Sequence, residues 1–170
     1  MLTRTEKRSY TAAVYRINAG AFETTAEAVL MDILREQAQP VISLVAQDDV
    51  TLAGHIMFSP VWVSSDDKLK IMGLAPMAVT PSRQCQSIGS VFVRAGLERG
   101  QELGFHAVLV LGHREYYPRF GFVPATRFGL RSEYDVPDDV FMATELEPGA
   151  LNGKSCVVKY HAAAMCKDDV

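Results

Sequence analysis

The chain has 170 residues, 48% of them hydrophobic, and carries a formal net charge of −3 at pH 7. This length fits one domain with a sizeable core, and the acidic balance with scattered basic residues argues against nucleic acid or an anionic membrane as a partner. No apolar run approaches the roughly 18 residues of a membrane-spanning helix, and residues 1–4 lead into no signal-peptide core. We therefore expect one domain over residues 1–170, soluble and cytoplasmic.

The three cysteines, Cys85, Cys156 and Cys166, form no CxxC pair and leave an odd count. This pattern indicates neither a disulfide framework nor a zinc site. We expect reduced thiols and no bound metal.

The N-terminal part of the chain predicts a short edge strand followed by two amphipathic helices. Residues 2–7 alternate as an edge strand does, and residues 10–22 carry apolar side chains on one side of a helix. Thr24-Thr25 can cap a second helix that runs to about Glu36. Its inward face is expected to carry Ala28, Leu30, Met31 and Leu34.

A hairpin follows the second helix. Residues 42–47 and 52–63 have the composition of strands, and Asp48-Asp49 between them is a hairpin turn signal. Asp66-Asp67 predicts the next turn, and Leu69 begins the strand that leads into the centre of the sequence. Together these elements predict an antiparallel set.

The stretch 72–122 predicts a strand, a turn, a helix, a second strand and a short helix. The first strand is stopped by Thr80-Pro81-Ser82, and a helical apolar pattern starts at Ser87 and ends at Gly104. Residues 107–111 form an uninterrupted apolar run, typical of a strand covered on both faces. The inward face of the helix is expected to carry Ile88, Val91, Phe92, Ala95 and Leu97.

Two strands joined by one helix should lie parallel, with a right-handed connection. Ligands collect beyond the carboxyl ends of such strands, here the turn 80–89 together with residues 112–117. The turn opens onto a helix N-terminus, where unpaired N–H groups and the helix dipole attract phosphate. A phosphate-bearing ligand is therefore expected at this place.

After Phe122 the chain loses its periodicity through Gly129 and Pro137-Asp138-Asp139. Residues 141–146 then predict another strand, and residues 157–160 a last short one.

Two motifs carry a resemblance to a known family. Arg83-Gln84-x-x-Ser87-x-Gly89, after Met77-Ala78-Val79, resembles the pyrophosphate-binding loop of the GNAT superfamily of N-acetyltransferases. Tyr-Tyr-Pro-Arg-Phe-Gly-Phe at residues 116–122 resembles its second hallmark. With LAPMAV, VRAGLE and FMATELEPGAL, the chain is similar to the YhbS-like branch. The resemblance implies an α/β (α+β) fold with a central mixed sheet, helices on both faces of it and a parallel strand–helix–strand unit. It also implies that the late strands complete the sheet and form one wall of the acceptor cleft.

The loop also departs from the family pattern. Cys85 and Ser87 stand where close relatives usually carry glycines, Gln86 where they often carry lysine, and His113-Arg114 where they often carry Asp-Pro. If residue 85 or 87 needs a positive φ, its side chain costs about 1 kcal/mol and crowds an approaching diphosphate. Ser87 is, however, suited to cap the helix through its hydroxyl.

The resemblance implies acetyl-CoA as co-substrate. Its diphosphate would meet the backbone of Gln84, Cys85, Gln86, Ser87, Ile88, Gly89 and Ser90. Its pantetheine chain would run along Met77, Ala78 and Val79, where a backbone N–H would polarise the thioester carbonyl.

Transfer to an amine requires the ammonium to lose a proton and the thiolate to gain one. The resemblance places Tyr117 in the position of the acid, with Tyr116 as the less favoured neighbour; either can instead be a half-buried packing aromatic. Glu27, His55 and His113 are candidate bases, each with a structural alternative, and His106 and His161 are weaker ones. Arg119 is either a phosphate ligand or a surface residue, and Cys85 either a reactive thiol or a small residue in a glycine's place.

We therefore interpret the chain as an N-acetyltransferase that moves an acetyl group to a primary amine by direct attack in a ternary complex. The alternative is a domain of the same fold that binds coenzyme weakly and acts as a ligand-sensing or partner-binding module. The pattern does not encode the acceptor, which can be a small molecule or a protein. A homodimer is a further expectation, because dimers are common among the relatives.

Overall fold

The computed structural model describes residues 1–22, 25–64, 66 and 68–160. Its central sheet has the order β1-β2-β3-β4-β5-β8-β6, and β9 pairs with both β3 and β7. The strands are β1 (Leu2–Thr5), β2 (Ile42–Asp48), β3 (Thr51–Val63), β4 (Ile71–Val79), β5 (Ala107–Leu111), β6 (Val123–Pro124), β7 (Leu130–Ser132), β8 (Phe141–Glu145) and β9 (Cys156–Lys159).

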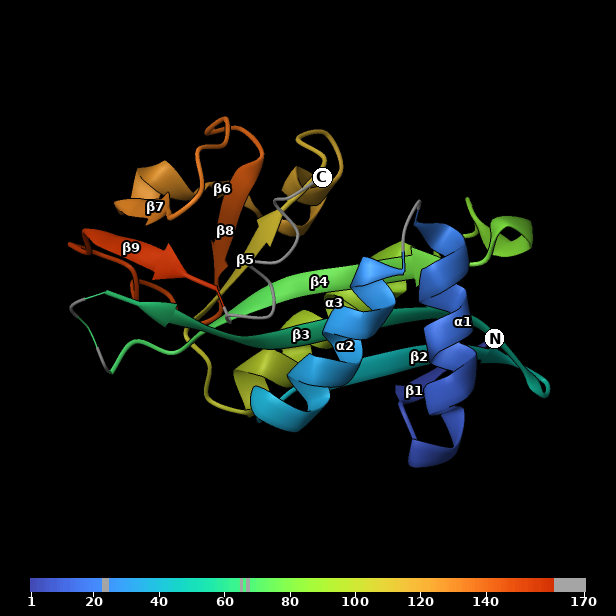
Figure 1. Ribbon diagram of the computed structural model, residues 1–170. Coiled ribbons are helices and arrows are strands. Elements are labelled where there is room, and N and C mark those ends of the chain that lie inside the picture. The colour runs from blue at the N-terminus through green and yellow to red at the C-terminus, as the bar shows by residue number, and fades with distance from the viewer. Residues whose placement is uncertain (23–24, 65, 67, 161–170) are drawn as a thin grey trace.

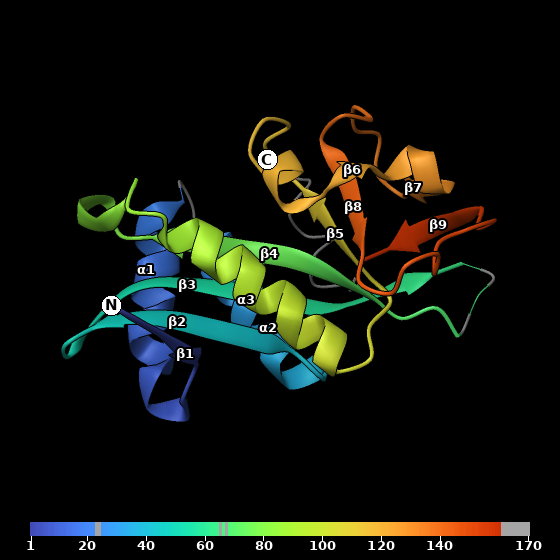
Figure 2. The same cartoon turned by 180° about the vertical axis from the view of Figure 1, so that it is seen from behind.

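Helices cover both faces of this sheet. Helices α1 (Thr11–Ala21) and α2 (Ala26–Gln37) lie over one face of β2 to β4 (Figure 1). Helix α3 (Ile88–Glu102) lies over the other face, as the view from behind shows (Figure 2). The expected mixed sheet with helices on both faces is thus confirmed.

The apolar side chains fill three clusters that follow these layers. One lies between α3 and the sheet around Phe58 and Phe92, and one lies under α1 and α2 around Met31. The third lies beneath β7 and β9 around Leu130. Ala28, Leu30, Met31 and Leu34 are buried, so the predicted inward face of α2 is correct.

The strands β4 and β5 pair in parallel, as the crossover pattern predicts, but only over a short length. The pairs are Ile71 with Ala107, Met72 with Val108 and Gly73 with Leu109. Beyond them the two strands diverge (Figure 1), and in the described part of the chain β4 runs on to Val79 with a strand neighbour on its β3 side alone. This fork exposes unpaired backbone groups in the centre of the sheet.

A β-bulge lies in β4 beside the fork. Met77 is opposite Ile56, whereas Leu74 is opposite Phe58, so β4 has one more residue than β3 in this segment. Because side chains alternate along a strand, one extra residue changes the face to which the following side chains point. Met77 and Val79 consequently pack on the α3 side together with Leu74.

Three local predictions need correction. Val91 is 46% exposed, and the buried face of α3 carries Gly96 and Gly100, which an apolar pattern does not count. The aperiodic stretch after Phe122 contains β6 and β7, too short to show a periodicity. Thr25 forms no side-chain cap bond at the start of α2. The other residue of that expected cap, Thr24, and Asp67 of the expected turn lie outside the described residues.

Candidate active site

The N-terminus of α3 lies at the carboxyl end of β4. The amides of Ser87, Ile88, Gly89 and Ser90 open the helix and donate to no backbone acceptor in the described chain; the first cap bond runs from the Val91 N–H to the Ser87 carbonyl at 3.1 Å. Free amides and the positive end of the helix dipole create a binding site for phosphate.

Two residues of the loop before α3 have left-handed backbone conformations. Cys85 has φ 61° and Ser87 has φ 64°, so the positive φ that the missing glycines suggested is present at both residues. Each non-glycine residue in this region costs about 1 kcal/mol. Ser87 forms no side-chain cap hydrogen bond, contrary to expectation. The reason is its left-handed backbone, since a capping residue normally has extended dihedral angles that direct its oxygen toward the first turn.

A cleft of about 700 Å³ runs from this helix end along β4. Of the residues expected to contact the coenzyme, all but Ala78 and Gln86 line this cleft. The side chain of Ala78 is buried. The lining residues are Met77, Val79, Arg83, Gln84, Cys85, Ser87, Ile88, Gly89, Ser90, His113, Tyr116 and Arg119.

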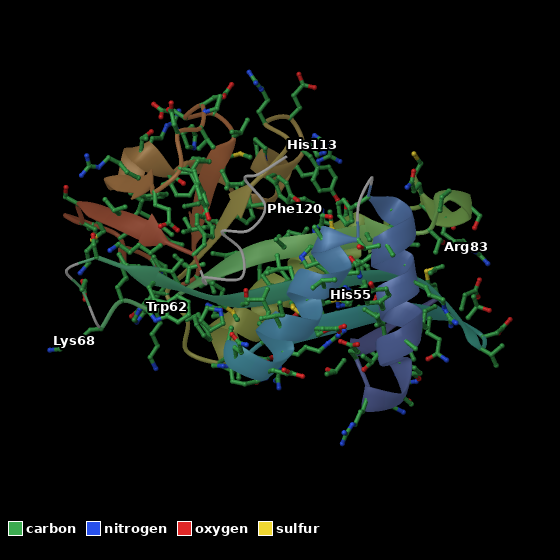
Figure 3. The ribbon with its side chains drawn as sticks, viewed as in Figure 1. His55, Trp62, Lys68, Arg83, His113 and Phe120 are labelled. Carbon is green, nitrogen blue, oxygen red and sulfur yellow. The ribbon has the colours of Figure 1, made fainter. Side chains whose placement is uncertain are left out.

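Basic side chains of the cleft have different partners. Arg83 forms an ion pair with Asp48 of the β2–β3 hairpin, a pairing for which the sequence offered no signal. Arg119 lies over the Tyr116 ring, with its guanidinium carbon 4.6 Å from the ring centroid. Because its guanidinium lies over this ring, Arg119 is held in the cleft, among the described residues, by an aromatic face and not by a carboxylate. Arg83 projects from the loop at the far end of the molecule from Trp62 and Lys68 (Figure 3).

The two adjacent tyrosines occupy different environments. Tyr116 lines the cleft, and its hydroxyl lies 2.7 Å from the position a Cβ would take at Gly89. Tyr117, in the 3-10 helix η3 (Tyr117–Phe120), is only 5% exposed and packs against Gly112 and Phe122. Burial, followed by the neighbouring Tyr116, raises the pKa of Tyr117 to about 12. Its phenol therefore keeps its proton at neutral pH.

A second cavity, of about 240 Å³, lies at the fork on the face of the sheet that bears α2. Both strands of the fork contribute to it, through Gly73 to Ala75 of β4 and Leu109 to Leu111 of β5. Leu30 and Leu34 of α2 cover it, together with Tyr134, Val136 and Tyr160. We call it the fork cavity. Neither Tyr134 nor Tyr160 could be named from the sequence, because both lie in stretches without a motif.

The candidate bases are dispersed. His55 is fully buried under α1 and α2, and its ring nitrogens contact Asn18 and Ser43 (Figure 3). Burial, with the Arg35 charge as a smaller cause, lowers the pKa of His55 to about 3. Since no amine can reach it, His55 is a structural residue, which is the alternative to a base that the sequence left open.

Glu27 and His113 lie elsewhere. Glu27 is half-buried in the first turn of α2 and lines neither the cleft nor the fork cavity. His113 is exposed, lining the cleft and also an open depression formed by residues 111–115 with Val136 and Val140. His106 accepts from the Lys70 amide, away from the fork, and His161 lies outside the described residues. Of the histidines in the described chain, His113 alone borders the cleft.

The two described thiols lie in different elements of the fold. Cys85 is exposed in the loop, Cys156 is buried in β9, and Cys166 lies outside the described residues. Residues 1–22, 25–64, 66 and 68–160 bring together no cluster of His, Cys, Asp and Glu that could hold a metal ion. Within those same residues, no helix combines the length and the apolar character needed to cross a membrane.

The chain is similar to known acetyltransferases in sequence. The model of the Acetyltransferase (GNAT) family matches residues 11–122. The uncharacterized N-acetyltransferase YhbS of Escherichia coli K12 is 38% identical over 142 residues, which cover 83% of this chain and 84% of YhbS. The uncharacterized N-acetyltransferase YjhQ of the same strain is 34% identical over 136 residues, covering 78% of this chain and 75% of YjhQ.

Solved structures show the same likeness. The crystal structure of YhbS from Escherichia coli in complex with CoA matches with a TM-score of 0.90 at 34% identity, covering 96% of this chain and 91% of that chain. A GNAT family acetyltransferase from Brucella melitensis in complex with acetyl-CoA matches with a TM-score of 0.78 at 30% identity, covering 96% and 97%. The family model matches most of the sequence, and relatives of this identity match along most of their length. The chain therefore belongs to the GNAT family of acetyltransferases.

Proposed function

We propose that this protein transfers the acetyl group of acetyl-CoA to a primary amine by direct attack in a ternary complex. One observation carries the proposal: the β4–β5 fork separates a cleft that contains the free amides of α3 from a cavity on the other face of the sheet. Such a fork provides one side for the coenzyme and one side for the acceptor. That relatives were crystallised with CoA and with acetyl-CoA supports the same arrangement.

The coenzyme side follows from the cleft. The diphosphate would accept hydrogen bonds from the amides of residues 84–90, and Arg119, which lines the same cleft, would meet a further phosphate. The pantetheine chain would lie along residues 77–79, where β4 has an unpaired edge. A backbone N–H of this edge would donate to the thioester carbonyl and stabilise the oxyanion that forms there.

The transfer itself forms one bond and breaks another. The neutral amine nitrogen attacks the acetyl carbon, the carbon–sulfur bond breaks, the nitrogen releases a proton and the departing thiolate gains one. Tyr117 would be the acid, because burial raises the pKa of its phenol to about 12 and so keeps the phenol protonated until the thiolate departs. It would donate its proton to the departing sulfur through a hydrogen bond to it.

A titration with acetyl-CoA tests the coenzyme site. Ligand binding to the folded state should raise the melting temperature, by the equivalent of about 2.7 kcal/mol at a hundredfold excess over Kd. Gly89→Ala should abolish this shift, because the new methyl group would lie 2.7 Å from the Tyr116 hydroxyl inside the cleft. Gly20→Ala is the matched control, since a Cβ there meets nothing within 4 Å.

The alternative function has its own outcome in this experiment. If millimolar acetyl-CoA leaves the melting temperature of the wild type unchanged, the transferase proposal fails and a sensing or partner-binding module is favoured. The left-handed Cys85 and Ser87 are the observation behind that alternative, because both carry side chains in the wall of the cleft where a glycine would carry none. Release of free CoA thiol in the presence of an amine library then tests the reaction.

A further inference from the structure

The fork cavity differs from the cleft in its chemistry. The described residues that line it include no Asp, Glu, Lys, Arg or His, and its polar side chains are Ser59, Tyr134 and Tyr160. The rest of its wall is aliphatic side chains and glycine backbone. A cavity of this composition offers no partner for a second charge on the acceptor.

An apolar wall selects among amines by desolvation. A carboxylate or a second ammonium group that entered the cavity would lose its water and gain no opposite charge, which is strongly unfavourable. An apolar group would lose only unfavourable hydration and would bind. Polyamines, sugars with several amines and free amino acids therefore fit this cavity poorly.

The volume of the fork cavity and one of its walls indicate which kind of apolar group it would bind. A dry cavity of roughly 150 Å³ is known to hold benzene, so about 240 Å³ accommodates a single ring with a short amine-bearing chain. Tyr134 and Tyr160 both line the cavity and stack on each other, with ring centroids 5.3 Å apart and planes at 22°, so one wall of the cavity is aromatic. Aromatic rings bind such surfaces by stacking or by edge-to-face contact.

The hydroxyl of Tyr160 is enclosed, and the side chain of Ser132 lies beside it. Burial raises the pKa of this phenol, so it stays protonated and available to a polar atom of a bound molecule. The cavity thus has a few uncharged hydroxyl groups, including that of Tyr160, for orientation within a mostly apolar wall.

The same composition accounts for the missing base. Burial in an apolar site lowers the pKa of an amine, because the charged form loses more hydration than the neutral form. An amine held in the fork cavity would reach the acetyl carbon in its neutral form without a carboxylate beside it. Its proton would leave to solvent through the open depression formed by residues 111–115, which shares Leu111 and Val136 with the cavity.

From these features we infer that the acceptor is a monoamine whose primary amine is carried on a single aromatic ring by a short chain. This inference rests on the proposed acetyl transfer and names the substrate class of that site. The geometry behind it is the fork cavity itself, which meets both strands of the fork where the acetyl group would lie.

Four amines test the inference by comparison of kcat/KM for release of CoA from acetyl-CoA. Phenylethylamine should exceed phenylalanine, which adds a carboxylate, and putrescine, which replaces the ring by a second amine, each by at least about tenfold. It should exceed propylamine, which lacks the ring, by a similar factor. Equal or better turnover of phenylalanine, putrescine or propylamine would overturn the inference.

A variant pair tests whether the fork cavity is responsible. Val136 is half-buried at the opening of the cavity, so Val136→Asp adds a carboxylate there, and Val136→Asn is its uncharged match. The ratio of putrescine to phenylethylamine turnover should rise at least about tenfold in Val136→Asp and stay at the wild-type value in Val136→Asn. An unchanged ratio in Val136→Asp would place the acceptor elsewhere.

Failure of the inference and failure of the proposed function look different. Turnover of putrescine or of a peptide amine, without turnover of phenylethylamine, retains acetyl transfer and rejects the inferred substrate class. If no amine is acetylated although acetyl-CoA binds, the transfer proposal fails. Calorimetric titration of CoA-loaded protein with phenylethylamine then shows whether the fork cavity binds this amine. Absence of binding rejects the inference as well.

Discussion

At the scale of single residues, the proposed transfer depends most on Tyr117. Its phenol is buried beside Gly112, and its pKa of about 12 means that it does not deprotonate in the working range of pH. Tyr117→Phe should lower kcat by about a hundredfold with little change in acetyl-CoA affinity, because the lost hydrogen bond acts on the leaving thiolate. Steady-state kinetics between pH 7 and about 10 measure this, and the wild type should show no loss of rate there from ionisation of Tyr117.

Tyr116 gives the matched comparison for that variant. Its hydroxyl lines the cleft over Gly89, so Tyr116→Phe should change the KM for acetyl-CoA more than kcat. A Tyr117→Phe enzyme with unchanged kcat across this range would remove Tyr117 from the reaction.

Ser87 illustrates backbone strain at one residue. Its φ of 64° is unfavourable for a serine, and its hydroxyl provides no compensating cap bond. Ser87→Gly should therefore raise the free energy of unfolding by about 0.5–1 kcal/mol and strengthen acetyl-CoA binding, since the loop is freed of a side chain. Urea unfolding and the thermal titration measure the two effects.

Ser90 is the control for this substitution. It lies in the first turn of the same helix, where a glycine loses helical propensity without relief of strain, so Ser90→Gly should destabilise the protein by about 0.5 kcal/mol. Equal destabilisation by both substitutions would contradict the assignment of strain to Ser87.

At the scale of elements, the approach of α3 to the sheet depends on Gly96. A Cβ at this residue would lie 2.0 Å from the ring of Phe58, which is fully buried in β3. Gly96→Ala should destabilise the fold by about 1–3 kcal/mol, because neither the ring nor the strand has space to move. Because α3 carries the free amides, the same variant should weaken acetyl-CoA binding.

A helical glycine without a neighbour separates packing from helix propensity. Gly20 of α1 meets nothing within 4 Å, so Gly20→Ala should stabilise the protein by about 0.5–1 kcal/mol. Denaturant midpoints of the two variants should thus move in opposite directions. A gain of stability in Gly96→Ala would show that the contact with Phe58 is looser than the structure indicates.

At the scale of the whole molecule, a buried polar network joins α1, α2 and the sheet through His55. The Asn18 amide nitrogen lies 3.1 Å from His55 Nδ1, and His55 Nε2 lies 2.8 Å from Ser43 Oγ, which donates in turn to Glu6. Glu6 pairs with Arg35 at 2.5 Å. Because Ser43 donates to Glu6, the neutral imidazole donates from Nε2 and accepts at Nδ1, so a second proton has no acceptor.

This network predicts the direction of the pH dependence of stability. The pKa of His55 is about 3 in the folded protein and near 6.5 in the unfolded chain, so the unfolded state takes up the proton first as pH falls. The contribution of His55 to stability is complete above pH 6.5 and decreases by up to about 1.4 kcal/mol per pH unit between about pH 6.5 and 3. Urea unfolding at a series of pH values measures this slope.

His55→Gln and His113→Gln provide the test and its control. His55→Gln should be less stable at pH 7 by about 1–3 kcal/mol, since partners of the ring lose their hydrogen bonds, but its stability should vary less between pH 6.5 and 4. His113→Gln changes an exposed histidine and should keep the wild-type slope. If the stability of both variants depends on pH with the same slope, the pH dependence does not come from His55.

Much of the fold could be predicted from local pattern. The helices around residues 11–21 and 26–37, the hairpin at Asp48-Asp49 and the parallel β4–α3–β5 unit follow from apolar periodicity and turn residues, which act over a few positions. The short β6 and β7 strands could not, because they are held by pairing with β8 and β9 and not by a periodicity of their own.

The candidate site was predictable to the extent that it depends on main chain. The strand end, the loop and the start of α3 are consecutive in the sequence, so the residues that surround one helix N-terminus could be named in advance. The burial of His55, the pairing of Arg83 with Asp48 and the meeting of Tyr134 with Tyr160 join residues far apart in the chain.

The sequence by itself thus determined the architecture and the place of a helix N-terminus at the end of β4, since both follow from short-range pattern. The tertiary structure alone decided that His55 is sealed in the core, that the loop is left-handed at Cys85 and Ser87, and that the fork cavity is apolar. The physical reason is that burial, backbone dihedral angle and cavity lining depend on which distant segments pack together, and no local pattern specifies that packing.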